Sequence, residues 1–295
     1  AGSQAASYLA QYEAANALMV ARQFESFNRM STFVVHDLKN LVSQLSLMLR
    51  NAERHRDNLD FQRGVQAFLT AIPAASANAM RTGMRTFGPD NETVLIAESL
   101  VDSHMLALTG NTETIYSMAW LDTKAGPLVI EVPPHVLGVI DDFWFRFVTD
   151  VGHVGPDKGD GGKYLLLPPG DTSQVPDGYF VVRSRTYGNW IFFRGFIEHG
   201  DLRPAVQNTK KNFRIYPLAR AADPPAMRFV NISGVPFNTI HSNDVTFFDE
   251  VAQVVQEEPL DAVDPETRGL LAAIGIQNGR PFSPDHRMKR ILVDA

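Results

Sequence analysis

Cysteine is absent from the 295 residues, so the chain has neither a disulfide framework nor a thiolate metal site. No apolar run approaches the length of a membrane-spanning helix. A basic surface is also missing, because the net charge is −6, and we therefore expect no nucleic-acid partner. The GxGxxG pattern of dinucleotide-binding loops and the GxSxG pattern of nucleophile elbows do not occur, and no motif predicts a cofactor.

Glycine and proline, the strongest helix breakers, are absent between Ser3 and Arg63. Apolar residues recur there at alternating steps of three and four, which is typical of the seam of a coiled coil or helical bundle. The pattern predicts one long helix that either dimerises in parallel or folds back on the rest of the chain, and we expect a homodimer. The predicted seam consists of Val20, Phe24, Phe27, Val34, Leu38, Leu41, Leu45, Met48 and Ala52.

His36 lies on the outer side of this predicted helix, with Asp37 beside it and Asn40 one turn later. A neighbouring carboxylate can hold one ring nitrogen of a histidine and leave the other nucleophilic. Most solvent-facing histidines have no such role. However, the string from 22 to 58, with FVVHDLKN at 33–40, closely resembles the first dimerisation helix of exosortase-linked (PEP-CTERM) sensor histidine kinases.

This resemblance implies that His36 is a phosphoacceptor, Asp37 its acidic partner and Asn40 the polar residue one turn later. It also implies a kinase or response-regulator partner and a cytoplasmic location. No ATP-binding domain follows, and GPDKGDGGKY at 155–164 departs from the Walker phosphate-loop pattern at Asp157 and Tyr164. We expect phosphate transfer to His36 in trans at most, without autophosphorylation.

The remainder of the chain predicts an α+β fold, a mainly antiparallel β-sandwich or barrel with short helices on both sides. Residues 61–88 read as two short helices broken at Pro73 and closed at Gly83 or Gly88. Short β-prone runs bounded by glycine and proline follow, and helical signals return after Pro217. The expected domains are a kinase-like helix, an opening helical segment, the sandwich and a second helical segment, at 1–60, 61–105, 106–220 and 221–295. The predicted strands lie within 114–123, 127–133, 163–169, 178–186 and 189–197, and the predicted later helices lie within 243–255 and 264–275 and after 283.

Residues 60–295 also resemble a family, the domain of unknown function 1254. The resemblance is carried by FQRGVQAFLTAIP, GPLVIEVPP, VIDDFWFRFVTDVGHVGPDKGDGGKYLLLPP and RSRTYGNWIFFRGF. It implies a β-sandwich with helices before and after it, a following domain of unknown function 1214, and an exported or periplasmic location. Because both resemblances meet at 57–63, we hypothesise that the chain is a chimera joined at this short shared string.

Candidate site residues in this larger part are polar side chains in turns, because loops concentrate function. If a pocket exists, we expect Asn111, Asp142, Asp157 and Lys163 to be its polar members. Asp141 and Asp142 should face opposite ways on a strand, with one solvated and the other capping or paired. The histidines after residue 64 show no metal-ligand spacing, so no metal site is predicted. The aromatic cluster at 143–147 reads as sandwich core and helix contacts.

Three functions therefore stay open from the sequence. The first is a ligand-binding or structural module that carries an oligomerising helix. The second is a phosphorelay fragment phosphorylated on His36 by another kinase. The third is a hydrolase or metal-dependent enzyme of unknown substrate, for which no motif speaks.

Overall fold

The computed structural model describes residues 42–43, 46, 49–51, 53–102 and 110–295. The chain forms two compact units, one of residues 1–58 with 294–295 and one of residues 59–293. In the first unit, described residues between 42 and 54 are helical, and the Asn51 side chain donates a hydrogen bond to the Asp294 carbonyl at 2.7 Å. The predicted coiled-coil seam lies outside the described residues and stays a prediction.

The second unit confirms the predicted α+β fold, with two sheets and several helices. Sheet A has six strands in the order β10-β1-β2-β8-β4-β5, and sheet B has four in the order β7-β6-β3-β9. The strands are β1 Thr93–Ile96, β2 Thr114–Asp122, β3 Leu128–Val132, β4 Val136–Asp142, β5 Phe147–Gly152, β6 Gly162–Leu167, β7 Phe180–Arg183, β8 Gly188–Phe196, β9 Arg214–Pro217 and β10 Arg228–Asn231. The helices are α2 Leu59–Arg85, α3 Arg203–Asn212, η1 Leu218–Arg220, α4 Thr246–Glu257, η2 Leu260–Ala262, α5 Pro265–Ala273 and α6 His286–Asp294.

All five predicted β-prone runs form strands, namely β2, β3, β6, β7 and β8. Most pairings are antiparallel, as predicted, but β1 pairs with β10 and β6 with β7 in parallel, so both sheets are mixed. The β1–β10 pairing joins strands far apart in the sequence, and no local turn signal predicts such a pairing.

A shared apolar core lies between the two sheets. Ile191 and Phe193 of β8 pack there with Ile130 of β3 and Tyr164 of β6, all of them 0% exposed. Because side chains alternate along a strand, Trp190 and Phe192 of β8 lie on the opposite, outer face of sheet A. A second core contains the outer-face residues Met118 and Trp120 together with the helices α2, α4 and α5.

The helical segment before the sheets differs from the prediction of two short helices. Residues Leu59–Arg85 form one helix with Pro73 inside it, and neither Pro73 nor Gly83 ends it. An interior proline removes one backbone hydrogen bond and costs about 3 kcal/mol in an isolated helix. Here the helix buries an alanine-rich face, which includes Ala67, Ala71, Ala74 and Ala75, and this tertiary packing outweighs the local cost.

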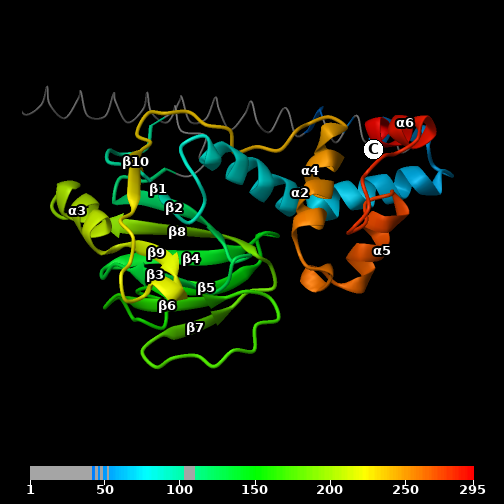
Figure 1. Cartoon of the computed structure of the whole chain (residues 1–295). Coiled ribbons are helices and arrows are strands. Elements are labelled where there is room, and N and C mark those ends of the chain that lie inside the picture. Colours follow the sequence, from blue (N-terminus) through cyan, green and yellow to red (C-terminus); the bar gives the residue numbers. More distant parts are fainter. Residues whose placement is uncertain (1–41, 44–45, 47–48, 52, 103–109) are drawn as a thin grey trace, which may run out of the picture. The chain divides into compact units, whose positions relative to one another are not determined.

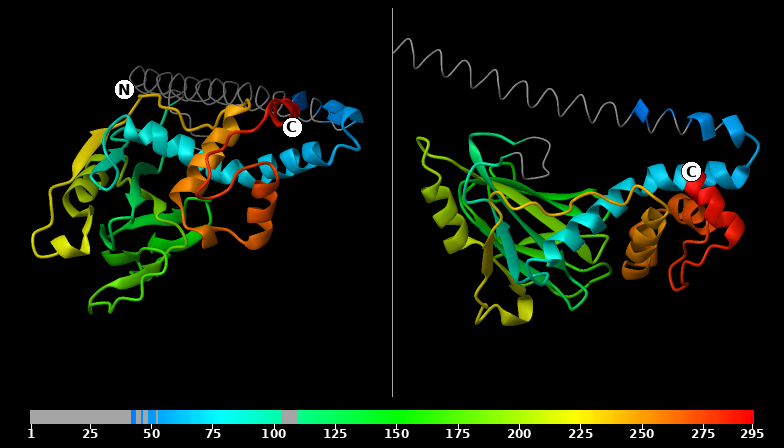
Figure 2. Two further views of the ribbon diagram at one scale, coloured as in Figure 1. Left: turned by 45° about the vertical axis from the view of Figure 1, so that its right-hand side comes forward. Right: turned by 90° about the horizontal axis from the view of Figure 1, so that it is seen from above.

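The later helices lie together at one end of the sheets, and α2 runs from this end toward the sheets (Figures 1 and 2). The predicted start of α5 holds: Asp264 caps it by accepting a hydrogen bond from the Thr267 N–H at 2.8 Å, and Pro265 is its first residue. The other two helices begin a few residues later than predicted, α4 at Thr246 and α6 at His286. α3 lies at the opposite end of the sheets (Figure 1). The ends of α4 and α5 and the β4–β5 turn surround the cavity described next.

Candidate functional site

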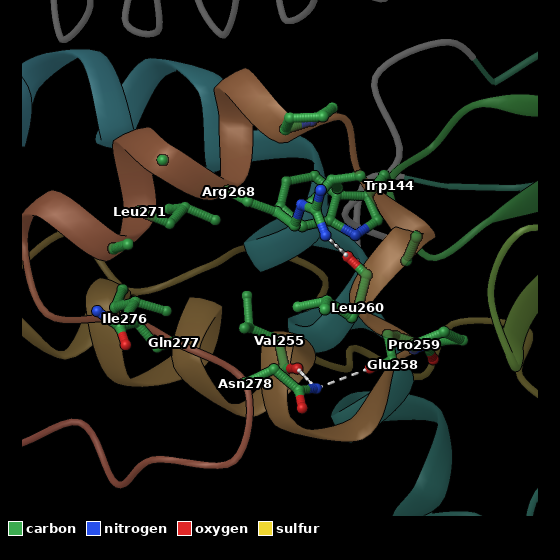
Figure 3. Close-up of a pocket in the computed structure, with 15 residues that line it drawn as sticks. Trp144, Val255, Glu258, Pro259, Leu260, Arg268, Leu271, Ile276, Gln277 and Asn278 are labelled. Carbon is green, nitrogen blue, oxygen red and sulfur yellow. Dashed lines mark hydrogen bonds between the residues drawn. The ribbon is translucent and has the colours of Figure 1, made fainter.

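A cavity of about 420 Å³ lies between the β4–β5 turn and the helical end of the domain (Figure 3). This volume falls within the range typical of small-molecule sites. Its walls are mainly apolar and are interrupted by the polar side chains of Glu258, Arg268, Gln277 and Asn278. The apolar lining comes from Trp144, Val255, Pro259, Leu260, Ala262, Val263, Pro265, Leu271, Ala272 and Ile276.

The β4–β5 turn holds Trp144 in this wall. The Asp142 carboxylate, which is 3% exposed, accepts hydrogen bonds from the backbone N–H groups of Trp144 at 2.8 Å and Arg146 at 3.1 Å. It also accepts one from Arg146 Nε at 2.7 Å. Arg146 in turn donates to the Ala262 carbonyl at 2.6 Å, so the turn is fixed to the opposite wall of the cavity. The aromatic ring is therefore positioned before any ligand arrives.

The opposite side of the cavity is tied to the C-terminal end of α4. The Asn278 amide donates to the carbonyls of Val255 at 2.8 Å and Glu258 at 3.0 Å (Figure 3). These are carbonyls that the end of a helix leaves without intrahelical partners. Gln256 accepts a hydrogen bond from the Gly279 N–H at 2.8 Å and so holds the same loop. The Asn278 side chain therefore satisfies backbone groups at the end of α4, and the side chains of Asn278 and Gln256 hold the loop that forms this wall of the cavity.

Glu258 is the most perturbed carboxyl group of the cavity wall. The residue is 4% exposed, and burial raises the pKa of its carboxyl to about 7, against the opposing effect of two backbone hydrogen bonds. These bonds come from the N–H groups of Gly188 at 2.9 Å and Tyr187 at 2.5 Å. Glu258 thus links α4 to the start of β8, and its charge changes near neutral pH.

Arg268 lies where this cavity meets a second one of about 430 Å³. Val263, Pro265 and Arg268 line both cavities, and the second also contains Ser184, Arg185, Asp261 and Asp264. The Arg268 guanidinium donates one long hydrogen bond, 3.4 Å, to the Leu260 carbonyl. Within the described part of the chain it forms no ion pair with a carboxylate. A guanidinium has five N–H donors, so most of the hydrogen-bonding capacity of Arg268 is unused.

A buried arginine beside the site contrasts with Arg268. The side chain of Arg81 on α2 is 3% exposed and forms ion pairs with Glu257 at 2.5 Å, Asp90 at 3.3 Å and Asp122 at 3.5 Å. Its guanidinium also lies 5.5 Å from the centre of the Trp120 ring. Arg81 therefore joins α2, β2 and α4, and we read it as structural.

The four predicted pocket residues lie in separate turns and strands, and none of them lines either cavity. The Asn111 side chain accepts a hydrogen bond from the Thr114 N–H in the turn that enters β2, and it donates one to the Tyr116 hydroxyl. The Asp142 carboxylate accepts a hydrogen bond from the Trp144 N–H and so holds the β4–β5 turn. Asp157 is buried, accepts from the N–H groups of Gly152 and Gly161, and also accepts a hydrogen bond from the Tyr164 hydroxyl. Lys163 is half exposed and pairs with Glu131 at 3.3 Å. Their ligand-binding role stays a prediction.

Two local predictions are informative. Asp141 and Asp142 face opposite ways, and Asp142 is the paired and capping member, as expected. The aromatic cluster divides, because Phe143 and Trp144 are buried, whereas Phe145 is 37% and Phe147 is 66% exposed. Assigning all four to the core was therefore wrong for the last two. His36, Asp37 and Asn40 lie outside the described residues.

Sequence reasoning passed over Glu258 and Arg268. The Asp264-Pro265 signal for the start of α5 fixes the helical position of Arg268. No signal indicates that Trp144 lies across a cavity from it. Among the described residues, no helix is long and apolar enough to cross a membrane. The same residues contain no group of three or more His, Asp or Glu side chains placed to hold a metal ion.

Comparison with known proteins supports the second resemblance. Residues 91–217 match the model of a family described as "Protein of unknown function (DUF1254)". A similar fold occurs in the crystal structure of the VPA0106 protein from Vibrio parahaemolyticus, with a TM-score of 0.57 and 16% sequence identity over 79% of this chain. The chain spans 56% of the length of that protein. No curated protein matches, and none of these matches bears on the histidine-kinase resemblance of residues 1–60.

Proposed function

We propose that the domain of residues 59–293 is a binding module for a small amphipathic anion. The apolar body of the ligand would occupy the cavity beside Trp144, and its carboxylate or similar group would bind Arg268. The observation that carries this proposal is Arg268, a guanidinium that lines an apolar cavity without a carboxylate partner among the described residues. Guanidinium groups form bidentate, charge-assisted hydrogen bonds with carboxylates, which suits them to this role.

The walls of the cavity suit a bound anion at low pH better than at high pH. The carboxyl of Glu258 accepts hydrogen bonds from two backbone N–H groups that position β8. Burial raises its pKa to about 7, so it adds negative charge to the wall above this pH. We therefore expect anions to bind more weakly as the pH rises through this value.

The test compares two ligands that differ only in charge, octanoate and octanol, by isothermal titration calorimetry on the whole chain. A charge-assisted hydrogen-bond pair contributes about 1.5–3 kcal/mol, which corresponds to a factor of roughly 10 or more in affinity. We expect Arg268→Gln to weaken octanoate binding by about this factor and to leave octanol binding unchanged. Arg203→Gln serves as the matched control, because Arg203 is 84% exposed and lies on α3.

The proposal is wrong if octanol binds as tightly as octanoate, or if Arg268→Gln leaves octanoate binding unchanged. Glu258→Gln adds a second readout, since octanoate affinity should then lose its dependence on pH near neutrality. The phosphorelay and hydrolase alternatives gain no support from the structure or from the family match, and we do not advance them. The predicted homodimer likewise awaits a measurement of mass in solution.

A further inference from the structure

A second feature, separate from the cavity, lies on the outer face of sheet A. Ile140 of β4 and Ile191 of β8 point into the core between the sheets. Their strand neighbours Asp141 and Trp190 therefore lie on the outer face, and these two are direct partners in the β4–β8 register. On the other side, Phe147 of β5 is the register partner of Asp141. Asp141 thus lies between two aromatic residues.

A third ring completes this arrangement. Phe145 packs edge-on against Trp190, with 5.7 Å between ring centres, and Phe192 stacks against Trp190 at 5.2 Å. Phe145 has a φ of 53°, a left-handed conformation that bulky residues rarely adopt. The Asp142 hydrogen bonds described above hold the turn in which it occurs. The fold thus holds an aromatic ring beside Trp190 at a conformational cost.

The carboxylates on this face lack partners. Among the described residues, no hydrogen bond or ion pair reaches the side chain of Asp141 or that of Asp150. Asp150 pairs in register with Val139 and so lies on the same face as Asp141. Burial raises the pKa of Asp141 to about 6, with further contributions from the charges of Asp142 and Asp150. A carboxylate that is partly desolvated and lies near other negative charges is stabilised more by an incoming cation than a fully solvated carboxylate is.

Two arginines close in sequence or on the same sheet, Arg146 and Arg194, do not supply that cation. Arg146 pairs with Asp142 at 2.7 Å. The Arg194 guanidinium lies over the rings of Tyr116, at 5.5 Å, and Phe192, at 5.7 Å, on the adjoining part of the face. Neither arginine forms an ion pair with Asp141 or Asp150 in the described part of the chain. The charge on this part of sheet A is therefore negative and uncompensated.

We propose that this face binds an organic ammonium ion, which Asp141 and Asp150 attract and which the rings of Trp190, Phe145 and Phe147 surround. Aromatic faces attract ammonium groups through the ring quadrupole, and methylated ammonium ions lose little hydration on entering such a site. Ca²⁺ and Mg²⁺ fit this site less well, because they require six or more oxygen ligands and the surrounding rings offer none. The combination of charge and exposed aromatic surface therefore selects an organic cation.

Choline and its uncharged analogue, in which carbon replaces the quaternary nitrogen, provide the test. Both are titrated into the whole chain by calorimetry at about pH 7.5, above the pKa of Asp141. We expect choline to bind and the analogue to bind at least about tenfold more weakly, because only choline carries the charge that the carboxylates and rings attract. Choline affinity should also fall as the pH drops below about 6, where Asp141 becomes neutral.

Three variants assign the binding to this face. Asp141→Asn and Trp190→Leu should each weaken choline binding by about tenfold or more. Asp223→Asn removes a side chain that is 94% exposed and should have no effect. Asp141→Asn should fold normally because the Asp141 side chain forms no hydrogen bond or ion pair with the residues that the structure describes, and a thermal unfolding curve checks this. Absence of choline binding, equal binding of the analogue, or unchanged binding by a folded Asp141→Asn variant would each overturn the proposal.

Discussion

Two adjacent carboxyl groups at the end of α4 should respond to pH in opposite directions. Burial raises the pKa of Glu258 from 4.5 to about 7. Burial also acts to raise the pKa of Glu257, but the hydrogen bond and charge of Arg81 outweigh it and lower that pKa to about 2. The two residues therefore make opposite contributions to the pH dependence of stability. Replacing each by glutamine removes its titration and leaves nearly the same shape.

The size of the Glu258 effect follows from these values. Below a pH of about 4.5 this carboxyl is neutral in the folded and the unfolded chain, and its contribution to stability is fully present. Above a pH of about 4.5 the carboxyl ionises in the unfolded chain but stays neutral in the folded chain until the pH reaches about 7. The free energy of unfolding therefore falls by about 3 kcal/mol in total over this range. Between about pH 5 and about pH 8 we expect a loss of about 2–3 kcal/mol from this one group.

The difference in the free energy of unfolding between Glu258→Gln and the wild type should change sign with pH. The amide accepts one of the two backbone hydrogen bonds and presents a donor to the other, which costs about 1–2 kcal/mol. At about pH 5 the variant should therefore be less stable than the wild type. At about pH 8 it avoids burying a charge and should be equally stable or more stable.

Glu257→Gln gives the matched comparison. The Glu257 side chain is 22% exposed, and its ion pair with Arg81 stabilises the fold above a pH of about 4.5 and is lost as the pH falls toward 2. After allowance for solvent screening, we expect the variant to lose about 2 kcal/mol at neutral pH and less in acid. Urea unfolding followed by circular dichroism and tryptophan fluorescence, at a series of pH values, measures all three proteins. If the difference between wild type and Glu258→Gln is the same at both ends of the series, the raised pKa is refuted.

Three further substitutions test the structural assignments by urea unfolding. Arg81→Met leaves three carboxylates without their buried partner and should cost about 3–5 kcal/mol; a cost below about 1 kcal/mol would contradict a role in joining α2, β2 and α4. Asp157→Asn weakens a buried set of three hydrogen bonds and should cost about 2–3 kcal/mol, with faster amide exchange at Gly152 and Gly161; unchanged exchange would count against it. Gly152→Ala places a Cβ 1.9 Å from the Val136 carbonyl oxygen and should cost more than about 3 kcal/mol. Its control, Gly170→Ala, has a similar φ and no atom within 4 Å, so it should cost only about 1–2 kcal/mol, and equal losses would show that the contact is unimportant.

Local signals in the sequence predicted a large part of the secondary structure. The Asp264-Pro265 pair marks the start of α5 because an aspartate cap and a proline at the first helical position need no tertiary partner. The five runs form strands because β-branched and aromatic residues favour extended chain, and glycine and proline near their ends mark the boundaries. Pro73 misled the prediction, because the cost of an interior proline is local and the burial that offsets it is not.

The candidate sites depended on contacts between distant segments. Trp144 follows β4, whereas Glu258 and Arg268 lie in the helical segment, and the sequence contains no pattern that joins them. The arrangement of carboxylates and aromatic rings on the outer face of sheet A could not be predicted for a related reason. A run of aromatic residues such as FWFRF predicts burial, but the turn that Asp142 organises sends Phe143 inward and leaves Phe145 and Phe147 exposed.

The sequence alone determined the α+β class, the start of α5, five of the strands and the opposite orientation of Asp141 and Asp142. Each of these depends on neighbouring residues, on chain stereochemistry or on the two-residue period of a strand. Only the tertiary structure decided the parallel pairing of β1 with β10 and of β6 with β7, the continuity of α2, and the surroundings of Glu258, Arg268 and Asp141. Burial and charge at these three residues come from elements brought together by folding, and their chemistry therefore cannot be read from the sequence around them.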